Sequence, residues 1–391
     1  MKVNIPCSFD FVSLVGGGIC SPQGFLANGM SAGIKRSGKA DLGLIASEVS
    51  AVTAVVFTKN SIKAAPLLVS MKHAARGIGR AVLVNSGNAN CYTGAFGLKY
   101  AQGSVELIAD LLGTKPADVL VTSTGIIGKQ LPYNKIKDAA PTLVKGLGRS
   151  GGGKFARAIM TTDLKMKEIA VQVKISGKTV TIGACGKGSG MIEPKMATML
   201  GFVTTDAAIS KDMLKKALKL ATERSFNSIT VDGCMSTNDM VTLQANGLAR
   251  NKRITTPNAE FKKFYAALEF VCIDLAKRIV IDGEGATKFL TIRVTGAASE
   301  VQARRIAKVI ANSPLVKTAA FGSNPNWGRV GAAVGSLGIK GISEQTMKIS
   351  FSPFDKKEIA INVALILGKA EATVYTCDLS YEYVKINGAY N

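Results

Sequence analysis

The chain has 391 residues, 47% apolar and 19% charged, which is typical of a globular protein and too long for one ordinary core. The net charge of +22 raises nucleic acid as a partner, but the basic residues are spread along the chain without a recognisable binding motif, so a basic nucleic-acid-binding protein is only a distant alternative. The N-terminus lacks a signal-peptide apolar region and the apolar runs are too short to span a bilayer, so we expect a cytoplasmic protein with no membrane partner.

The first half of the chain alternates short apolar strands with turns rich in glycine and asparagine. Apolar β-runs predict strands at 51–57, 81–85 and 119–122. Apolar residues at helical spacing predict a helix over 98–112. A hairpin is predicted over 169–182, because two alternating runs flank a Ser-Gly turn.

Helices dominate the next part of the chain. Ser210 is predicted to cap a helix over 211–223. Thr256 and Pro257 are typical of a helix start, and they predict a long helix that runs to about residue 280.

The last third returns to strands. A strand is predicted at 290–294 and a helix at 301–311, followed by β-hairpins whose last strand covers 381–387. This mixture of strands, hairpins and helices predicts an α+β fold rather than a doubly wound parallel sheet. A subdomain boundary is predicted near 285–298.

Metal and cofactor sites have little support in the sequence. The seven cysteines are widely scattered and form no CxxC pair, so neither a zinc knuckle nor a disulfide framework is indicated. The glycine triplets at 16–18 and 151–153 match no nucleotide-binding motif. We therefore expect neither a metal nor a cofactor.

A glycine-rich segment near the middle of the chain carries a candidate nucleophile. Residues 188–207 read GSGMIEPKMATMLGFVTTDA, in which Thr198 follows the small Ala197. An activated hydroxyl usually needs a histidine, and His73 is the only one in the chain. A threonine at a newly made N-terminus uses its own α-amine as the base, and this segment suits that solution. The alternative is that 196–203 is an ordinary buried strand.

Further residues could complete a site without histidine. Lys187 is a cation flanked by glycines, and Glu284 lies between two glycines after a helix. Thr124 and Gly125 could supply a hydroxyl and a backbone N–H to an oxyanion. Each is by itself typical of a polar turn, but together they provide the donors, cation and anion that acyl transfer needs.

Eight short blocks run through the chain in a fixed order. They are VNSGNAN (84–90), STGIIG (123–128), AIMTTD (158–163), MIEPKMATML with TTDA (191–207), SFNSITVDG (225–233), STND (236–239), DGEGATK (282–288) and NPNWGR (324–329). Together they closely resemble the ornithine acetyltransferase family, also called glutamate N-acetyltransferase. The resemblance covers nearly the whole chain.

The resemblance implies a fold and a processing step. The fold is a layered α/β/β/α sandwich of the DmpA-like type, with a smaller α/β subdomain at the C-terminus. The precursor cuts itself between Ala197 and Thr198. The products are an α chain, 1–197, and a β chain, 198–391, which stay associated as an α2β2 assembly.

The resemblance also implies a reaction. Thr198 takes the acetyl group of N-acetylornithine and passes it to glutamate by a ping-pong mechanism, while Thr124 and the Gly125 N–H stabilise the oxyanion. Substrate contacts fall on Thr161, Lys187, Thr198, Glu284 and Asn387. Acetyl-CoA as a second acetyl donor stays open. The main alternative is a self-cleaving N-terminal-threonine amidase or aminopeptidase, which gives the acyl group to water.

Overall fold

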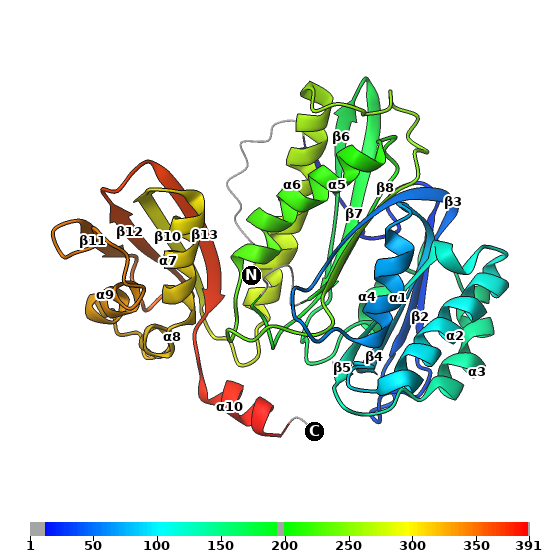
Figure 1. Cartoon of the computed structure of the whole chain (residues 1–391), viewed down its shortest axis with the longest axis horizontal. Helices are drawn as coiled ribbons and strands as arrows, with labels where there is room; N and C mark the ends of the chain where they lie inside the picture. Colours follow the sequence, from blue (N-terminus) through cyan, green and yellow to red (C-terminus); the bar gives the residue numbers. More distant parts are fainter. Residues whose placement is uncertain (1–11, 194–198, 390–391) are drawn as a thin grey trace. The chain divides into compact units, whose positions relative to one another are not determined.

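A computed structural model describes residues 12–193 and 199–389, which divide into two units (Figure 1). The large unit comprises 12–188, 199–226 and 235–275, and the small unit comprises 189–193, 227–234 and 276–389. No helix in these described ranges is long and apolar enough to cross a membrane.

A nine-stranded sheet forms the framework of the large unit. Its strands are β1 (Val12–Val15), β2 (Phe25–Met30), β3 (Leu42–Phe57), β4 (Ile78–Asn88), β5 (Val119–Ile126), β6 (Lys167–Ile175), β7 (Lys178–Lys187), β8 (Leu200–Thr205) and β9 (Met240–Ala245). Eight of them follow the order β1-β6-β7-β8-β9-β3-β4-β5, and β2 pairs with β3 beside this path. The pairs β4–β5 and β8–β9 are parallel, so their carboxyl ends meet at the same edges.

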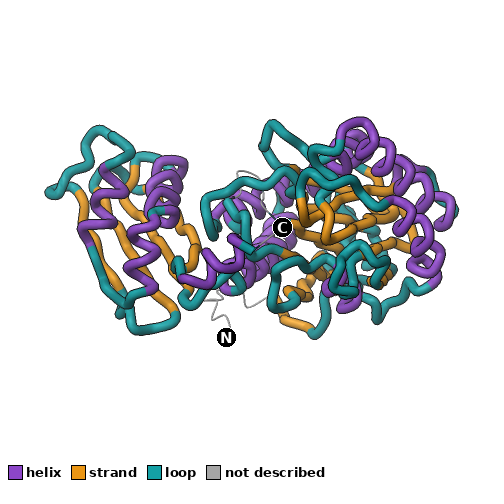
Figure 2. The backbone as a smooth tube through the Cα atoms, turned by 90° about the horizontal axis from the view of Figure 1, so that it is seen from below, coloured by secondary structure: helices purple, strands orange, loops and turns teal. Residues whose placement is uncertain are grey.

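Helices cover this sheet (Figure 2). They are α1 (Ala65–Ala74), α2 (Gly94–Leu112), α3 (Tyr133–Lys145), α4 (Gly152–Ala158), α5 (Lys211–Arg224) and α6 (Ala259–Ile281), the last of which continues into the small unit from residue 276. Two short 3₁₀ helices, η1 (Pro116–Asp118) and η2 (Phe226–Ser228), are also present in the described residues.

Both faces of the central strands are buried, and β4 shows why. Successive side chains of a strand point to opposite faces. Val82 and Val84 belong to the apolar cluster that includes α4, whereas Ala81 and Leu83 belong to the cluster that includes α2 and α3. A strand covered on both faces reads as a continuous apolar run, as β4 does.

The small unit is built on a four-stranded sheet. Its elements are β10 (Phe289–Ala297), α7 (Glu300–Asn312), α8 (Pro314–Phe321), α9 (Trp327–Gly335), β11 (Met347–Phe351), β12 (Glu358–Leu365), β13 (Ala370–Cys377) and α10 (Tyr381–Gly388). The strand order is β11-β12-β10-β13. Helix α7 packs on β10 and β13, and its buried alanines and isoleucines share one apolar core with the sheet.

Helices packed on mixed sheets in both units confirm the predicted α+β layered fold. The predicted cap of α5 is also confirmed, since the Ser210 side chain accepts a hydrogen bond from the Met213 N–H. Helix α6 begins later than predicted. The Asn258 side chain caps it by accepting from the Phe261 N–H, so Thr256 and Pro257 precede the helix.

Two predictions for the C-terminal part are wrong. Residues 381–387, predicted as the last strand, form the helix α10, in which Glu382 and Lys385 make an ion pair one turn apart. The strands after residue 347 are not simply successive hairpins. β10, earlier in the chain, lies between β12 and β13, parallel to the first and antiparallel to the second.

The packing of α4 on β8 yields a stability prediction. Phe155 of α4 is fully buried, and its ring meets Phe202 of β8 edge-on, with centroids 5.2 Å apart. Phe155→Ala should lower the free energy of unfolding by about 3–5 kcal/mol, because the lost contacts leave a cavity. Urea titration measures this loss. Phe96→Ala, at a position 60% exposed in α2, should cost under about 0.5 kcal/mol, and equal losses at both positions would contradict the packing.

Candidate active site

The carboxyl ends of β4 and β5 form a rigid edge that presents Thr124 and Gly125. Gly125 has a φ of +132°, which disfavours any residue with a side chain. A Cβ at this position would also lie 2.4 Å from the carbonyl carbon of Gly87 in β4. The close approach of the two strands therefore requires glycine, and it fixes the neighbouring Thr124 at the edge of the sheet.

Asn238, a buried residue just before β9, stabilises this edge. The Asn238 amide donates to the carbonyls of Ala89 and Ser123, at 2.7 and 2.8 Å. The Ser123 hydroxyl in turn donates to the Asn85 side chain at 2.6 Å. This network satisfies the polar groups of the turns after β4 and in β5, so the turns are held in one arrangement.

Lys187 forms hydrogen bonds with two other predicted site residues of the large unit. It is the last residue of β7 and only 8% exposed, whereas a turn lysine would lie in solvent. Its ammonium group donates to the hydroxyls of Thr161 and Thr124, at 2.8 and 3.2 Å. Lys187 pairs with Leu200, so these three side chains gather at the end of the sheet where β8 begins, two residues after Thr198.

Asp163 supplies the negative charge behind this cluster. Its carboxylate is buried and accepts from the Lys167 ammonium group at 2.7 Å, the Gly188 N–H at 2.8 Å and the Thr161 N–H at 3.0 Å. Burial alone would raise the pKa of Asp163, but the charges of Lys187 and Lys167 and these hydrogen bonds hold the pKa well below its usual range. Asp163 is therefore ionised and offsets the buried cations.

Lys35 is a second lysine near the cluster, and the sequence analysis did not predict its role. Its ammonium group donates to the carbonyls of Ala40 and Met160, both at 2.7 Å. Burial lowers the pKa of Lys35 to about 8; the nearby Asp41 opposes this shift and the charge of Lys187 adds to it. Asp163 and Asn238 lie in blocks that the sequence singles out, but their roles depend on contacts between distant segments.

Glu284 and Asn387 come together in the small unit. The Asn387 amide donates to the Glu284 carboxylate at 2.9 Å, and the Glu284 N–H donates to the Ser189 carbonyl at 2.8 Å. Glu284 is 9% exposed and therefore is not an ordinary surface turn residue. A Cβ at Gly190 would lie 2.1 Å from its carboxylate oxygen, so glycine there makes room for the acid.

The predicted nucleophile and cleavage site, Thr198 and Ala197, lie outside the described residues. The alternative interpretation predicted a buried strand over 196–203. In the structure, β8 begins at Leu200 and covers the last four of these residues. The lone histidine is engaged elsewhere, since the His73 ring contacts the Val119 carbonyl at 2.8 Å. The roles assigned to the site residues stay predictions.

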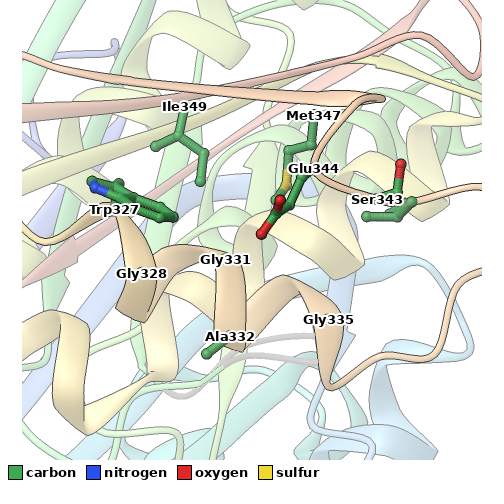
Figure 3. A pocket seen from close by; sticks show the side chains of 10 residues that line it. Trp327, Gly328, Gly331, Ala332, Gly335, Ser343, Glu344, Met347 and Ile349 are labelled. Carbon is green, nitrogen blue, oxygen red and sulfur yellow. The ribbon is translucent and has the colours of Figure 1, made fainter.

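A cavity of about 530 Å³ lies in the small unit and is separate from these residues (Figure 3). The small residues of α9 form one wall, and Met347 and Ile349 of β11 lie across from them. The NPNWGR block builds this helix: Asn326 caps it, and Arg329 donates to the Leu315 carbonyl at 2.7 Å. None of the predicted site residues that the structure describes lines the cavity.

Comparison with known proteins identifies the family. The model of the ArgJ family matches residues 26–391. The chain belongs to the ArgJ family. The arginine biosynthesis bifunctional protein ArgJ of Symbiobacterium thermophilum is 46% identical to this ArgJ family protein, over 96% of this chain and 98% of the relative. The protein of the same name from Caldanaerobacter subterraneus subsp. tengcongensis is 45% identical, over 97% and 100%.

Solved structures are also similar to this chain. ArgJ from Bacillus halodurans is 40% identical, with a TM-score of 0.45, and covers 48% of this chain and 98% of that chain. Ornithine acetyltransferase from Mycobacterium tuberculosis, complexed with ornithine, is 38% identical, with a TM-score of 0.45, and covers 48% and 100%. The family model and the curated relatives confirm the predicted family and the class of enzyme, an ornithine acetyltransferase of arginine biosynthesis.

The buried ammonium group of Lys35 yields a prediction of pH dependence. An unfolded lysine has a pKa of about 10.4, above the value of about 8 in the folded protein. Between these values the unfolded state binds more protons, so stability rises with pH through this window. The free energy of unfolding of the wild type, measured relative to Lys35→Met, should therefore increase from about pH 8 to pH 10. A flat difference would contradict the burial of this charge.

Proposed function

We propose that this ArgJ family protein transfers the acetyl group of N-acetylornithine to glutamate, with Thr198 as the nucleophile. The observation that carries the proposal is the hydrogen bonding of Lys187 to Thr124 and Thr161, at the sheet end where the chain continues from Thr198 into β8. A cation and two hydroxyls thus meet where β8 begins, two residues after Thr198 in the sequence, which supports Thr198 as the nucleophile. Membership of the family supports the choice of substrates.

The nucleophile would be created by self-cleavage between Ala197 and Thr198. The cut divides the protein into an α chain, 1–197, and a β chain, 198–391. It releases the α-amino group of Thr198, which then serves as the base that histidine supplies in other acyl-transfer enzymes. The engagement of His73 with the Val119 carbonyl supports a mechanism without histidine.

Acetyl transfer then takes place in two halves. The Thr198 hydroxyl attacks the acetyl carbonyl as its proton passes to the α-amine, and the Thr124 hydroxyl and Gly125 N–H stabilise the tetrahedral oxyanion. Collapse breaks the amide bond, and the leaving ornithine amine takes the proton from the α-ammonium group. The neutral glutamate amine next attacks the acetyl-threonine ester, and its proton passes through the Thr198 α-amine to the threonine oxygen. The ester C–O bond breaks, which restores the free hydroxyl and releases N-acetylglutamate.

The two charged site residues would bind substrate groups of opposite charge. Lys187 would contact the α-carboxylate that N-acetylornithine and glutamate share, next to Thr161. Glu284 would meet an ammonium group, with Asn387 fixing its carboxylate. The assignments of Glu284 and Asn387 to substrate rest on the family resemblance.

The proposal extends to a second donor and to the assembly. The name of the curated relatives, bifunctional protein, supports acetyl-CoA as an additional acetyl donor for glutamate. Release of coenzyme A on mixing acetyl-CoA with glutamate measures this activity directly. We further propose a cytoplasmic location and an α2β2 assembly of the cleaved chains, and the family resemblance supports this assembly.

Cleavage gives the first test of the function. Purified wild-type protein should run on a denaturing gel as two bands, each near half of 40.9 kDa. Thr198→Ala should give one full-length, inactive band, because it lacks the hydroxyl that both steps need. Thr198→Ser keeps the hydroxyl and should retain partial cleavage. An intact wild-type chain with full transferase activity would contradict the mechanism.

The acceptor gives the second test and separates a transferase from an amidase. Ornithine release from N-acetylornithine should be at least about tenfold faster with glutamate present, because glutamate removes the acetyl group from the covalent intermediate. Steady-state ornithine assays with and without glutamate measure the ratio. Equal rates would favour an enzyme that gives the acyl group to water.

A further inference from the structure

The ammonium group of Lys35 has no role in the mechanism above, although it lies against the turn that carries Thr161. Lys35 belongs to the loop between β2 and β3 and is half-buried. Its ammonium group has three N–H groups to donate, and it bonds to the carbonyls of Ala40 and Met160, both at 2.7 Å. Because Met160 directly precedes Thr161, Lys35 holds the turn from which Thr161 contacts Lys187.

The aliphatic stem of Lys35 packs on the edge formed by β4 and β5. A Cβ at Gly87 of β4 would lie 2.8 Å from the Cγ atom of Lys35, so the stem covers bare backbone there. Gly87 is also the residue against which Gly125, the predicted oxyanion donor, makes its close approach. Lys35 therefore connects this edge with the turn before Thr161, the same two segments that Lys187 connects by its hydrogen bonds.

The hydrogen-bond partners of the Lys35 ammonium group are neutral carbonyls. A carboxylate, that of Asp41, lies in the same loop, but its oxygens accept from the backbone N–H groups of Ala32 at 2.6 Å and Lys35 at 2.8 Å. Burial, and then the charge of Lys187, lowers the pKa of Lys35, as expected for two cations that lie close together. An anion bound beside both cations would relieve their repulsion, and the α-carboxylate of the substrates is such an anion.

We propose that Lys35 is a positioning residue that makes the site selective for substrates with an α-carboxylate. It keeps the turn before Thr161 in place and adds a second positive charge near Lys187, the expected partner of the carboxylate. The inference rests on the proposed function, in which N-acetylornithine and glutamate share this group. A second cation strengthens the binding of a carboxylate but gives nothing to an analogue that lacks one.

Lys35→Met tests the inference, because it keeps most of the stem against Gly87 and removes the ammonium group. KM for N-acetylornithine and KM for glutamate should each rise by about tenfold with kcat within about twofold, since the carboxylate is bound in the ground state and in the transition state alike. The inhibition constant of N-acetylputrescine, which is N-acetylornithine without its carboxylate, should stay within about twofold of the wild type. Steady-state assays of ornithine release, with N-acetylputrescine as the competing inhibitor, measure these constants.

Two variants serve as matched controls. Lys35→Arg keeps the charge and can donate to both carbonyls, so its KM values should stay within about threefold of the wild type. Lys135 of α3 is exposed, and its ammonium group donates to the Gly33 carbonyl in the same loop. Lys135→Met therefore removes a similar bond without touching the cluster, and it should change neither the KM values nor the inhibition constant.

If Lys35→Met does not fold, the pH dependence of Lys35→Arg decides. The charged groups that surround position 35 are the same in both proteins, namely Asp41, Lys187, Asp163 and Lys39. Above about pH 8 the wild-type Lys35 loses its proton, whereas a guanidinium group stays charged. The ratio of KM for N-acetylornithine to the inhibition constant of N-acetylputrescine should therefore rise more steeply from pH 8 to 10 in the wild type. The same rise in both proteins would refute the inference.

Two results with a folded Lys35→Met variant would also overturn it. One is a set of KM values equal to those of the wild type. The other is an inhibition constant of N-acetylputrescine that rises as much as KM, because the loss would then not depend on the carboxylate. In either case the wild type still passes acetyl groups to glutamate, and the proposed function stands. If the wild type transfers no acetyl group from N-acetylornithine to glutamate, the proposed function fails and the inference fails with it.

Discussion

The organisation of the large unit depends on burying the ammonium group of Lys187. A charge taken out of water is costly unless it is paired and hydrogen-bonded. Here two threonine hydroxyls accept from it, and the ionised Asp163 compensates its charge. Asp163 itself is held by Lys167 and by the backbone at Thr161 and Gly188. The result is a fixed cation at the end of a strand, with its partners drawn from two other segments of the chain, at Thr124 and at 161–163.

Sheet topology brings those segments together. The parallel pair β4–β5 places its turns at one edge, and β7 and β8 run antiparallel so that Lys187 lies opposite Leu200. The glycine at position 125 lets the backbone of β5 approach that of β4 without a side chain between them. The local sequence determines where each strand forms. The order of the strands in the sheet then brings together residues that are more than 60 positions apart, such as Thr124 and Lys187.

The sequence predicts what local chemistry controls and fails where distant contacts decide. The Ser210 cap and the 169–182 hairpin follow from short-range rules, and the structure has both. The strand predicted over 381–387 is wrong for a different reason, since these residues form α10, which has no buried residue and so does not owe its helical form to distant packing. Resemblance to a family, not spacing, singled out Thr161 and Asn387. The burial of Lys35 cannot be predicted from the local pattern, because the Met160 carbonyl that it contacts lies 125 residues away in the chain.

The strand order has a consequence for two chains made by a cut between residues 197 and 198. The first chain would keep β1 to β7, and the second would bring β8 and β9, which lie side by side between β7 and β3. The second chain is thus inserted into the sheet of the first, with hydrogen-bonded neighbours on both flanks. Neither product could leave without opening two strand edges at once, and exposed edges invite aggregation. Maturation would therefore be irreversible in practice, and the two halves should assemble only when they are synthesised as one precursor or folded in each other's presence.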